Sequence, residues 1–247
     1  MRAFTPAELL TVWERGLAEP PARRALALLA PVCDGESAAE LAELPIGRRD
    51  ARLLTARELT FGSRLSGLAD CPACAAAVEM EFDVAALRVG EDSHAQNAGA
   101  ALRIEHPTGT VTFRLPNTDD CGALAGVTSE EEARALLLER CVLTRPVTEG
   151  VSPDADLSLE LATAISARMR DADPQAEIEI DLACPECGHR WSAPFDIASY
   201  FWNELAACAQ RLVHEVHALA SAYGWSEAEI LALSPARRGA YLQMIST

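Results

Sequence analysis

Apolar residues recur every three or four positions at both ends of the chain, a spacing that predicts helices. In the N-terminal third, capping boxes at Thr5–Glu8 and Ser37–Glu40 mark two helix starts, and a further helical stripe runs from Arg48 to Phe61. In the C-terminal fifth, a long stripe runs from Phe201 to Tyr223, and a capping box at Ser226–Glu229 opens another helix. Helices are therefore predicted on both sides of the middle region.

In the middle of the chain the pattern changes to a period of two, which is typical of half-buried strands. The segment Ala176–Leu182 alternates apolar and acidic residues, and Val78–Phe82 alternates in the same way. Two more alternating segments flank Pro107–Gly109, which predicts a β-hairpin. Helices over 129–142 and from about 156 to 170 complete the middle region.

Two Cys-Pro-x-Cys pairs occupy Cys71–Cys74 and Cys184–Cys187, at an offset of 113 residues. A Phe-Asp-aliphatic-Ala sequence follows each pair at the same distance, at Phe82–Ala85 and at Phe195–Ala198. A repeat that stays in register over this length indicates a duplicated unit. We therefore expect two hairpins of one design, each with a cysteine pair at its tip.

Together, Cys71, Cys74, Cys184 and Cys187 supply the four thiolates of a closed tetrahedral zinc site, which holds a fold together rather than activating water. A thioredoxin-type redox pair starts a helix, whereas strand-like sequence follows both pairs here. Structural zinc is therefore favoured over a redox pair and over inert thiols. Ordinary ribbons separate their halves by about 15–20 residues, so one chain supplies both halves or two chains share the sites. His189 is expected to be a turn residue rather than a spare ligand.

The combined pattern predicts an α+β protein that is mainly α-helical. Two zinc-knuckle β-hairpins form a ribbon-like four-cysteine site, helices pack around it, and the C-terminus is helical. We expect an N-terminal helical region over 1–62, a duplicated zinc-knuckle core over 63–200 and a C-terminal helical region over 201–247.

Composition narrows the function classes. Nearly half of the 247 residues are hydrophobic, only 5% are aromatic, and the net charge is −16. A nucleic-acid surface needs clustered Lys and Arg, so the charge argues against nucleic-acid binding. The sequence opens directly into an amphipathic segment, and its longest apolar runs are shorter than the roughly 18–20 residues of a membrane span. These features predict a cytoplasmic protein without a membrane span.

Four further cysteines, Cys33, Cys121, Cys141 and Cys208, lie singly in apolar or helical surroundings. In a reducing compartment such residues are expected to be thiols packed in the core. Two disulfides are the alternative.

No catalytic constellation stands out in the sequence. His214–His217 invites comparison with a metalloprotease helix, but that motif needs histidines four residues apart and these are three apart. A solvated helix face explains the segment, and a metal-dependent hydrolase is the less favoured alternative. Acidic residues at Asp119–Asp120 and at 130–132 fit helix caps and first turns better than an acid–base site. The protein is therefore predicted not to be an enzyme.

A series of motifs runs through the second half of the sequence. They are Cys184–Trp191, Phe195–Ile197, Phe201–Glu204, Glu215–Ala220, Tyr223–Glu227, Ile230–Leu233 and Arg237–Leu242, with Phe113–Asp120 and Leu136–Cys141 upstream. Together they resemble the baseplate hub assembly protein (chaperone) family of T4-like contractile phages and of related phage-tail-like contractile injection systems. Cysteine pairs are not a feature of every relative, so the metal prediction rests on this sequence alone.

The resemblance implies a non-enzymatic protein that helps a baseplate hub assemble or remains as a minor hub component. Its partners would be baseplate hub or tail proteins, and it would be cytoplasmic or incorporated into a phage-tail-like particle. The C-terminal segment carries Trp225, Arg237, Arg238 and Tyr241, residue types that dominate interface hot spots. We expect these residues to bind the partner; the alternative is that the segment caps the domain. A zinc-ribbon regulatory or protein-interaction module is the alternative function.

Overall fold

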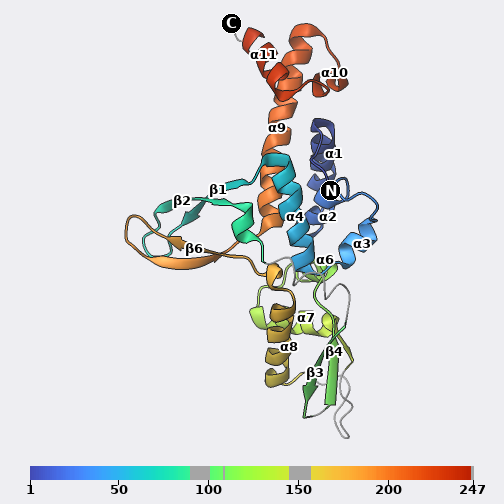
Figure 1. The fold of residues 1–247 in the computed structure, drawn as a ribbon, viewed down its shortest axis with the longest axis vertical. Helices are drawn as coiled ribbons and strands as arrows, with labels where there is room; N and C mark the ends of the chain where they lie inside the picture. Colours follow the sequence, from blue (N-terminus) through green and yellow to red (C-terminus); the bar gives the residue numbers. More distant parts are fainter. Residues whose placement is uncertain (90–100, 108, 145–156, 246–247) are drawn as a thin grey trace.

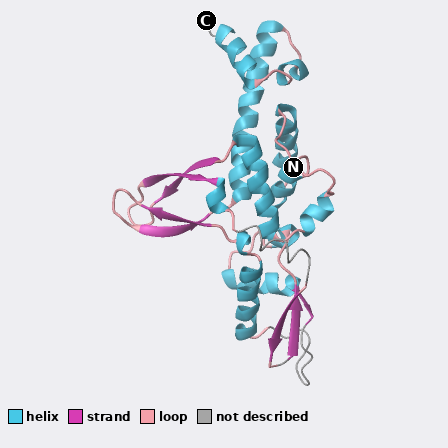
Figure 2. Ribbon diagram, viewed as in Figure 1, coloured by secondary structure: helices cyan, strands magenta, loops and turns pink. Residues whose placement is uncertain are grey.

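The computed structural model describes residues 1–89, 101–107, 109–144 and 157–245 and shows a mixed α/β protein that is mainly helical (Figure 1). One long helix, α9 (Ile197–Tyr223), forms its spine. The N-terminal helices lie along this spine, two β-hairpins project from it as an arm, and a second α/β lobe lies at its lower end. In the described residues, strands are confined to the arm and to this lobe (Figure 2). The predicted mainly helical class is confirmed.

The N-terminal helices begin where their capping boxes predict. Thr5 and Ser37 accept hydrogen bonds from the N–H groups of Glu8 and Glu40, and each glutamate side chain accepts the N–H of its cap residue in return. Three of these helices pack against the spine, and the third in sequence, α3, packs on α2. The four helices are α1 (Pro6–Leu17), α2 (Pro21–Leu29), α3 (Ala38–Glu43) and α4 (Ile46–Phe61).

The spine helix begins one turn before the predicted stripe at Phe201. The Asp196 carboxylate accepts hydrogen bonds from the N–H groups of Ala198 and Ser199, which fixes the helix start. The helix ends before Gly224, whose φ of 69° lies in the left-handed region that glycine adopts without strain. No helix in the described ranges, α9 included, is long and apolar enough to cross a membrane. Two short helices follow, α10 (Glu227–Leu231) and α11 (Pro235–Ile245).

The main hydrophobic core lies between the spine and the N-terminal helices. Phe201 is fully buried, and the rings of Phe4 and Phe61 lie 6.1 and 6.0 Å from its ring. Helix α1 approaches so closely that a Cβ on Gly16 would lie 2.3 Å from the Trp202 ring, so only glycine fits there. This core draws residues from all three regions expected from the sequence, and the boundaries of those regions remain a prediction.

The second lobe has a hydrophobic core of its own. Its hairpin around Pro107–Gly109 is confirmed, because Leu102 pairs with Phe113 and Ile104 with Val111. Position 108 of the turn and position 156, the expected start of the next helix, lie outside the described residues. A third strand, β5, pairs with β4 and was not predicted. The lobe contains β3 (Leu102–His106), β4 (Gly109–Phe113), α6 (Thr118–Ala123), α7 (Glu130–Cys141), β5 (Val142–Thr144) and α8 (Leu159–Ala172).

A buried carboxylate joins α6 to the rest of this lobe. Asp120 is fully buried, and its carboxylate accepts hydrogen bonds from Arg114 at 2.9 Å, from Arg140 at 2.8 Å and from the N–H of Asn117 at 2.9 Å. Burial alone would raise the pKa of Asp120, but these donors, led by Arg114, lower the pKa to about 2. Asp120 therefore has the capping role that the sequence indicated, with an ion-pair role that it did not.

The projecting arm consists of two antiparallel hairpins. Strand β1 completes the first of the two expected hairpins, although its own sequence gives no strand pattern, because it contains glycine, serine and alanine and lacks β-branched residues. The strand predicted over Ala176–Leu182 is present, but its predicted start is wrong: Pro174–Ala176 forms a short 3-10 helix, and the strand begins at Glu179. The arm contains β1 (Arg64–Asp70), β2 (Ala77–Asp83), β6 (Glu179–Ala183) and β7 (Arg190–Pro194), with η1 (Val84–Leu87) and η2 (Pro174–Ala176) at its base.

Candidate metal centre

Both hairpin tips fold into the same turn. In the first, the N–H of Cys71 donates to the carbonyl of Ala76 at 2.9 Å, and the N–H of Ala75 donates to the carbonyl of Cys71 at 2.8 Å. In the second, equivalent bonds join Cys184 to His189 at 2.9 Å and Gly188 to Cys184 at 3.0 Å. Ala75 and Gly188, which occupy matching positions in the two turns, have φ values of 57° and 72°. The Cys-Pro-x-Cys sequence therefore sets one backbone geometry twice, and each turn directs its two sulfurs to the same side.

The two tips bring all four paired cysteines together. The Sγ atoms of Cys71 and Cys187 are 3.7 Å apart, and those of Cys74 and Cys184 are 3.6 Å apart. All four sulfurs lie within 4.8 Å of one another. A tetrahedral zinc site with Zn–S bonds of about 2.3 Å places its sulfurs about 3.8 Å apart. The cluster therefore has the donor set and the spacing that a zinc ion requires, and a single chain supplies both halves.

The cluster is closed on one side and open on the other. Cys71 and Cys184 are buried beside Val78 and against Trp191, whereas Cys74 and Cys187 are exposed at the end of the arm. His189 stacks on the Trp191 ring with centroids 6.0 Å apart and does not join the sulfur cluster. His189 is therefore a turn and packing residue, as expected.

The sulfurs compete for protons because they lie so close together. Burial would raise the pKa of Cys71, but the N–H groups of Ala73 and Cys74 and the neighbouring thiols lower it to about 7. The N–H of Ala76 lowers the pKa of Cys74, but the thiols of Cys187 and Cys184 raise it to about 12. Metal binding requires thiolates, so a metal cation bound by these sulfurs would displace their protons.

The two hairpins are equivalent copies of one unit. Cys71 corresponds to Cys184 and Cys74 to Cys187, so the short Sγ–Sγ contact of Cys71 with Cys187 is equivalent to that of Cys184 with Cys74. Both hairpins also have the same strand register at the 113-residue offset. At the base of the arm, Phe82 and Phe195 meet edge to face at 5.6 Å. Asp83 and Asp196 then cap the helices that follow. The sequence repeat thus corresponds to a repeated structural unit.

The histidines considered for a hydrolase do not form a metal site in the described part of the chain. Nδ1 of His214 lies 2.7 Å from the carbonyl oxygen of Gln210, one turn earlier on an exposed helix face. Within the described residues, the four cysteines are the only group of three or more His, Cys, Asp or Glu side chains close enough to share an ion. Of the lone cysteines, Cys33 and Cys141 are buried, Cys121 and Cys208 are half-buried, and all are free thiols.

The C-terminal end of the spine carries an aromatic cluster. Tyr223, Trp225 and Tyr241 lie in mutual contact, with ring centroids 4.7 to 5.6 Å apart. Arg237 is exposed, whereas Arg238 is buried and its guanidinium binds Glu215 at 2.8 Å and the carbonyl of Leu233 at 2.7 Å. Met244 is 67% exposed. Of the four residues expected to bind a partner, Arg238 therefore lies inside this tip.

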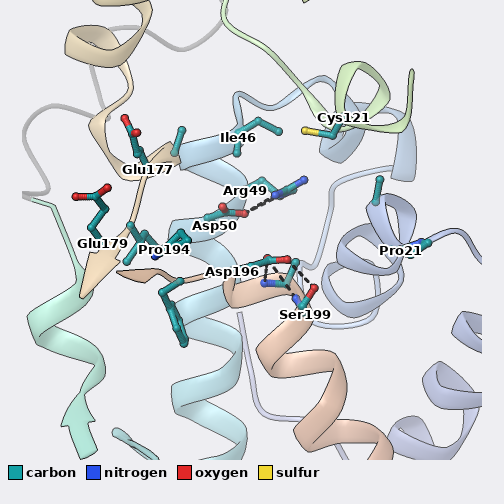
Figure 3. Close-up of a pocket in the computed structure, with 15 residues that line it drawn as sticks. Pro21, Ile46, Arg49, Asp50, Cys121, Glu177, Glu179, Pro194, Asp196 and Ser199 are labelled. Carbon is teal, nitrogen blue, oxygen red and sulfur yellow. Dashed lines mark hydrogen bonds and ion pairs between the residues drawn. The ribbon is translucent and has the colours of Figure 1, made fainter. Parts of the chain in front are cut away.

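Sequence reasoning missed a pocket at the junction of the arm, the spine and the second lobe. Its centre is a buried Arg49–Asp50 ion pair on α4 (Figure 3). The sequence pattern could have indicated this ion pair, because Arg49 and Asp50 precede the buried Leu53 and Leu54 by one helical turn and therefore lie on the same helix face. Charged residues at core positions of a helix often mark a site or an ion pair.

Comparisons with known proteins identify one match. The model of the family described as "T4 bacteriophage base plate protein" matches residues 26–202, which is more than half of the chain. The matched range contains the second lobe, both hairpins and the four paired cysteines, and it ends before the C-terminal tip. Searches of curated proteins and of solved structures found no match.

Proposed function

Because the chain belongs to the T4 bacteriophage baseplate protein family, we propose that it is a non-enzymatic assembly factor or minor component of a contractile, phage-tail-like baseplate hub. The family match is the observation that carries this proposal. The partners are then baseplate hub or tail proteins, and the protein acts in the cytoplasm of the producing cell or within the particle.

Structural zinc is the second part of the proposal. The four cysteines fit a tetrahedral site in number, chemistry and spacing, and no fifth ligand or open coordination position is needed. Cys71, Cys74, Cys184 and Cys187 would hold the ion, which would supply a cross-link between the two hairpins rather than reactivity. Its role would be to fix the arm relative to the spine.

A non-enzymatic role is supported by how the acidic residues are used. Asp120 caps α6 and pairs with two arginines, and Glu130 begins α7 and pairs with Arg134. Asp120 and Glu130, the acidic residues that could be read as an acid–base pair in the sequence, are thus each bound to arginine partners. Nucleic-acid binding is disfavoured by the −16 net charge and by the outward-facing Glu79 and Glu81 on the arm.

For the partner-binding surface we propose the C-terminal tip. Trp225 and Tyr241 form a preformed aromatic platform, and Arg237 and Met244 are exposed on the same short helical cap. Arg238 contributes from within, because its ion pair with Glu215 ties α11 to the spine. The four residues predicted from the sequence thus divide into a contact group and one positioning residue.

Capture of hub subunits tests this surface. The full chain would be co-expressed with the hub subunits of the same particle, and the captured hub protein would be measured for the wild type and for the double variant Arg237→Glu, Met244→Glu. Both side chains are exposed, so the variant should fold and bind zinc like the wild type. We expect hub capture to fall at least about tenfold, as for the loss of an interface hot spot.

The matched control is Arg168→Glu, which changes the charge of an exposed residue on α8 in the second lobe. It should leave hub capture unchanged. Equal capture by the wild type and the double variant would contradict the tip as the contact surface. Absence of capture by every form, including the wild type, would contradict the hub role.

A further inference from the structure

The pocket at the junction of the arm, spine and second lobe has a volume of about 380 Å³. Its walls come from α2, α4, α6, the segment that leads into β6 and the start of α9, as Figure 3 shows. This volume lies in the range of pockets that hold a small ligand or a side chain. Three parts of the molecule thus enclose one space.

A buried carboxylate faces this space. The Asp50 side chain is only 10% exposed, and Arg49 binds its Oδ1 through Nε and a terminal nitrogen, both at 2.8 Å. Its second oxygen, Oδ2, accepts no hydrogen bond from the described residues. No fully buried side-chain oxygen of the described residues lacks a partner, so Oδ2 keeps contact with solvent. Because Asp50 lines the pocket, this oxygen is the acceptor that a donor entering the pocket would reach.

The charge around the pocket is acidic. Asp50 and Asp196 both line the space. Burial raises the pKa of Asp50, and the charge of Asp196 adds to this effect. Glu179 and Glu177 also line the space, and Glu177 pairs with Arg170 outside it. Arg49 is the only lysine or arginine among the lining residues, all of which belong to the described ranges, and it is already held by Asp50 and by Thr118.

The distribution of these groups favours an extended cation over a metal ion. No three carboxylates of the pocket come close enough to share an ion, since the cysteine cluster is the only such group in the described chain. Much of the remaining wall is apolar, with Ile46, Ile178 and Pro194 among its residues. An aliphatic stem that ends in several N–H donors matches both the apolar walls and the separated acceptors.

We propose that this pocket binds the guanidinium of an arginine side chain on an extended segment of a partner protein. The guanidinium donates to Asp50 Oδ2, the other carboxylates that line the pocket favour its positive charge, and its methylene groups lie against the apolar part of the wall. This inference does not depend on the C-terminal tip or on the baseplate role, because it concerns a different surface and is tested with a peptide alone.

The test is a titration of the ¹⁵N-labelled full chain with acetyl-Gly-Arg-Gly-amide at about 150 mM salt, a concentration that screens weak surface attraction. A matched peptide with citrulline in place of arginine keeps the shape and removes the charge. We expect the arginine peptide to shift the amide signals of Gly47 and Ser199, and the citrulline peptide to bind at least about tenfold more weakly. The affinity of a matched lysine peptide is expected to lie between those of the arginine and citrulline peptides.

Two variants tie binding to the pocket. Asp50→Asn should weaken arginine-peptide binding at least about tenfold, whereas Glu14→Gln, which removes the same charge from an exposed site on α1, should not change it. Ala22→Leu fills the pocket from α2 without altering charge and should also block binding. Any one of four results would overturn the proposal. They are equal affinity for the arginine and citrulline peptides, tighter binding of the lysine peptide, equal weakening by Asp50→Asn and Glu14→Gln, and unchanged affinity of Ala22→Leu for the arginine peptide.

Discussion

The helical body and the projecting arm are stabilised in different ways. The body buries a large contiguous core, with α9 packed against α1, α2 and α4. The cluster at the end of the arm has only three buried residues, and two of them are cysteines. Such a small apolar cluster cannot offset the entropy of ordering two hairpins. We therefore expect the body to fold by burial alone and the arm to depend on the proposed zinc cross-link at its tip.

Removing the cross-link should have the largest effect. The double variant Cys184→Ser, Cys187→Ser should reduce bound zinc from about one equivalent per chain to almost none. Structural zinc contributes on the order of 10 kcal/mol in small zinc domains, so the arm should lose protection from amide exchange while the helices of the body keep theirs. Metal analysis and hydrogen exchange measure both effects.

The control for this variant is Cys208→Ser, at a half-buried lone cysteine on the spine. It should keep its full zinc content. If the double variant also kept its zinc, the shared four-cysteine site would be wrong. If the body unfolded together with the arm, the contrast between the two regions would not hold.

The reverse experiment weakens the body and leaves the cross-link. Phe201→Ala removes a fully buried ring that contacts Phe4 and Phe61, and should lower the free energy of unfolding by about 3–5 kcal/mol. Thermal unfolding followed by circular dichroism measures this loss. Zinc content should stay near one equivalent. Val213→Ala, at a 44% exposed position of the same helix, should change stability by less than about 0.5 kcal/mol.

A smaller, pH-dependent effect on stability is expected in the second lobe, which differs in this from the body and the arm. The pKa of Asp120 is about 2 in the folded state, below the usual value of about 3.9. Its ion pairs therefore stabilise the fold above about pH 4, and this contribution, about 1–2 kcal/mol, is lost as the pH falls from 4 towards 2. Asp120→Asn should remove this pH dependence without changing zinc content.

Denaturant unfolding at pH 7 and at pH 3 checks this prediction in the wild type and the variant. Glu130→Gln is the matched control, because its carboxylate is 87% exposed and pairs with a single arginine. If the free energy of unfolding fell by the same amount between pH 7 and pH 3 in the wild type and in Asp120→Asn, other groups would dominate acid unfolding.

Elements with a local signal could be predicted from the sequence, and those fixed by distant contacts could not. The capping boxes at Thr5 and Ser37 and the Cys-Pro-x-Cys turns are decided by neighbours within a few residues, and all of them formed as expected. Strand β1 could be expected only from the repeat, because its own sequence has low β-propensity and its pairing with β2 decides its conformation. The start of α9 was placed late because the Asp196 cap precedes the apolar stripe.

The candidate sites divide in the same way. The cysteine pairs could be recognised as candidate metal ligands because each pair lies in its own local turn, although their meeting across 113 residues was an inference from the repeat. The Arg238–Glu215 ion pair joins two helices, and the pocket around Asp50 draws on segments from α2 to α9. No local pattern specifies such contacts, so the burial of Arg238 and the pocket were visible only in the folded chain.

The separation of the two hairpins along the chain sets an order of events during synthesis. The first cysteine pair leaves the ribosome 113 residues before the second, a delay of about 6–23 s at about 5–20 residues per second. During this interval the second lobe, which has its own core between the two hairpins, can fold. The four cysteines can come together only after the second hairpin has emerged, so the proposed zinc ion would bind late, when more than two thirds of the chain has been synthesised.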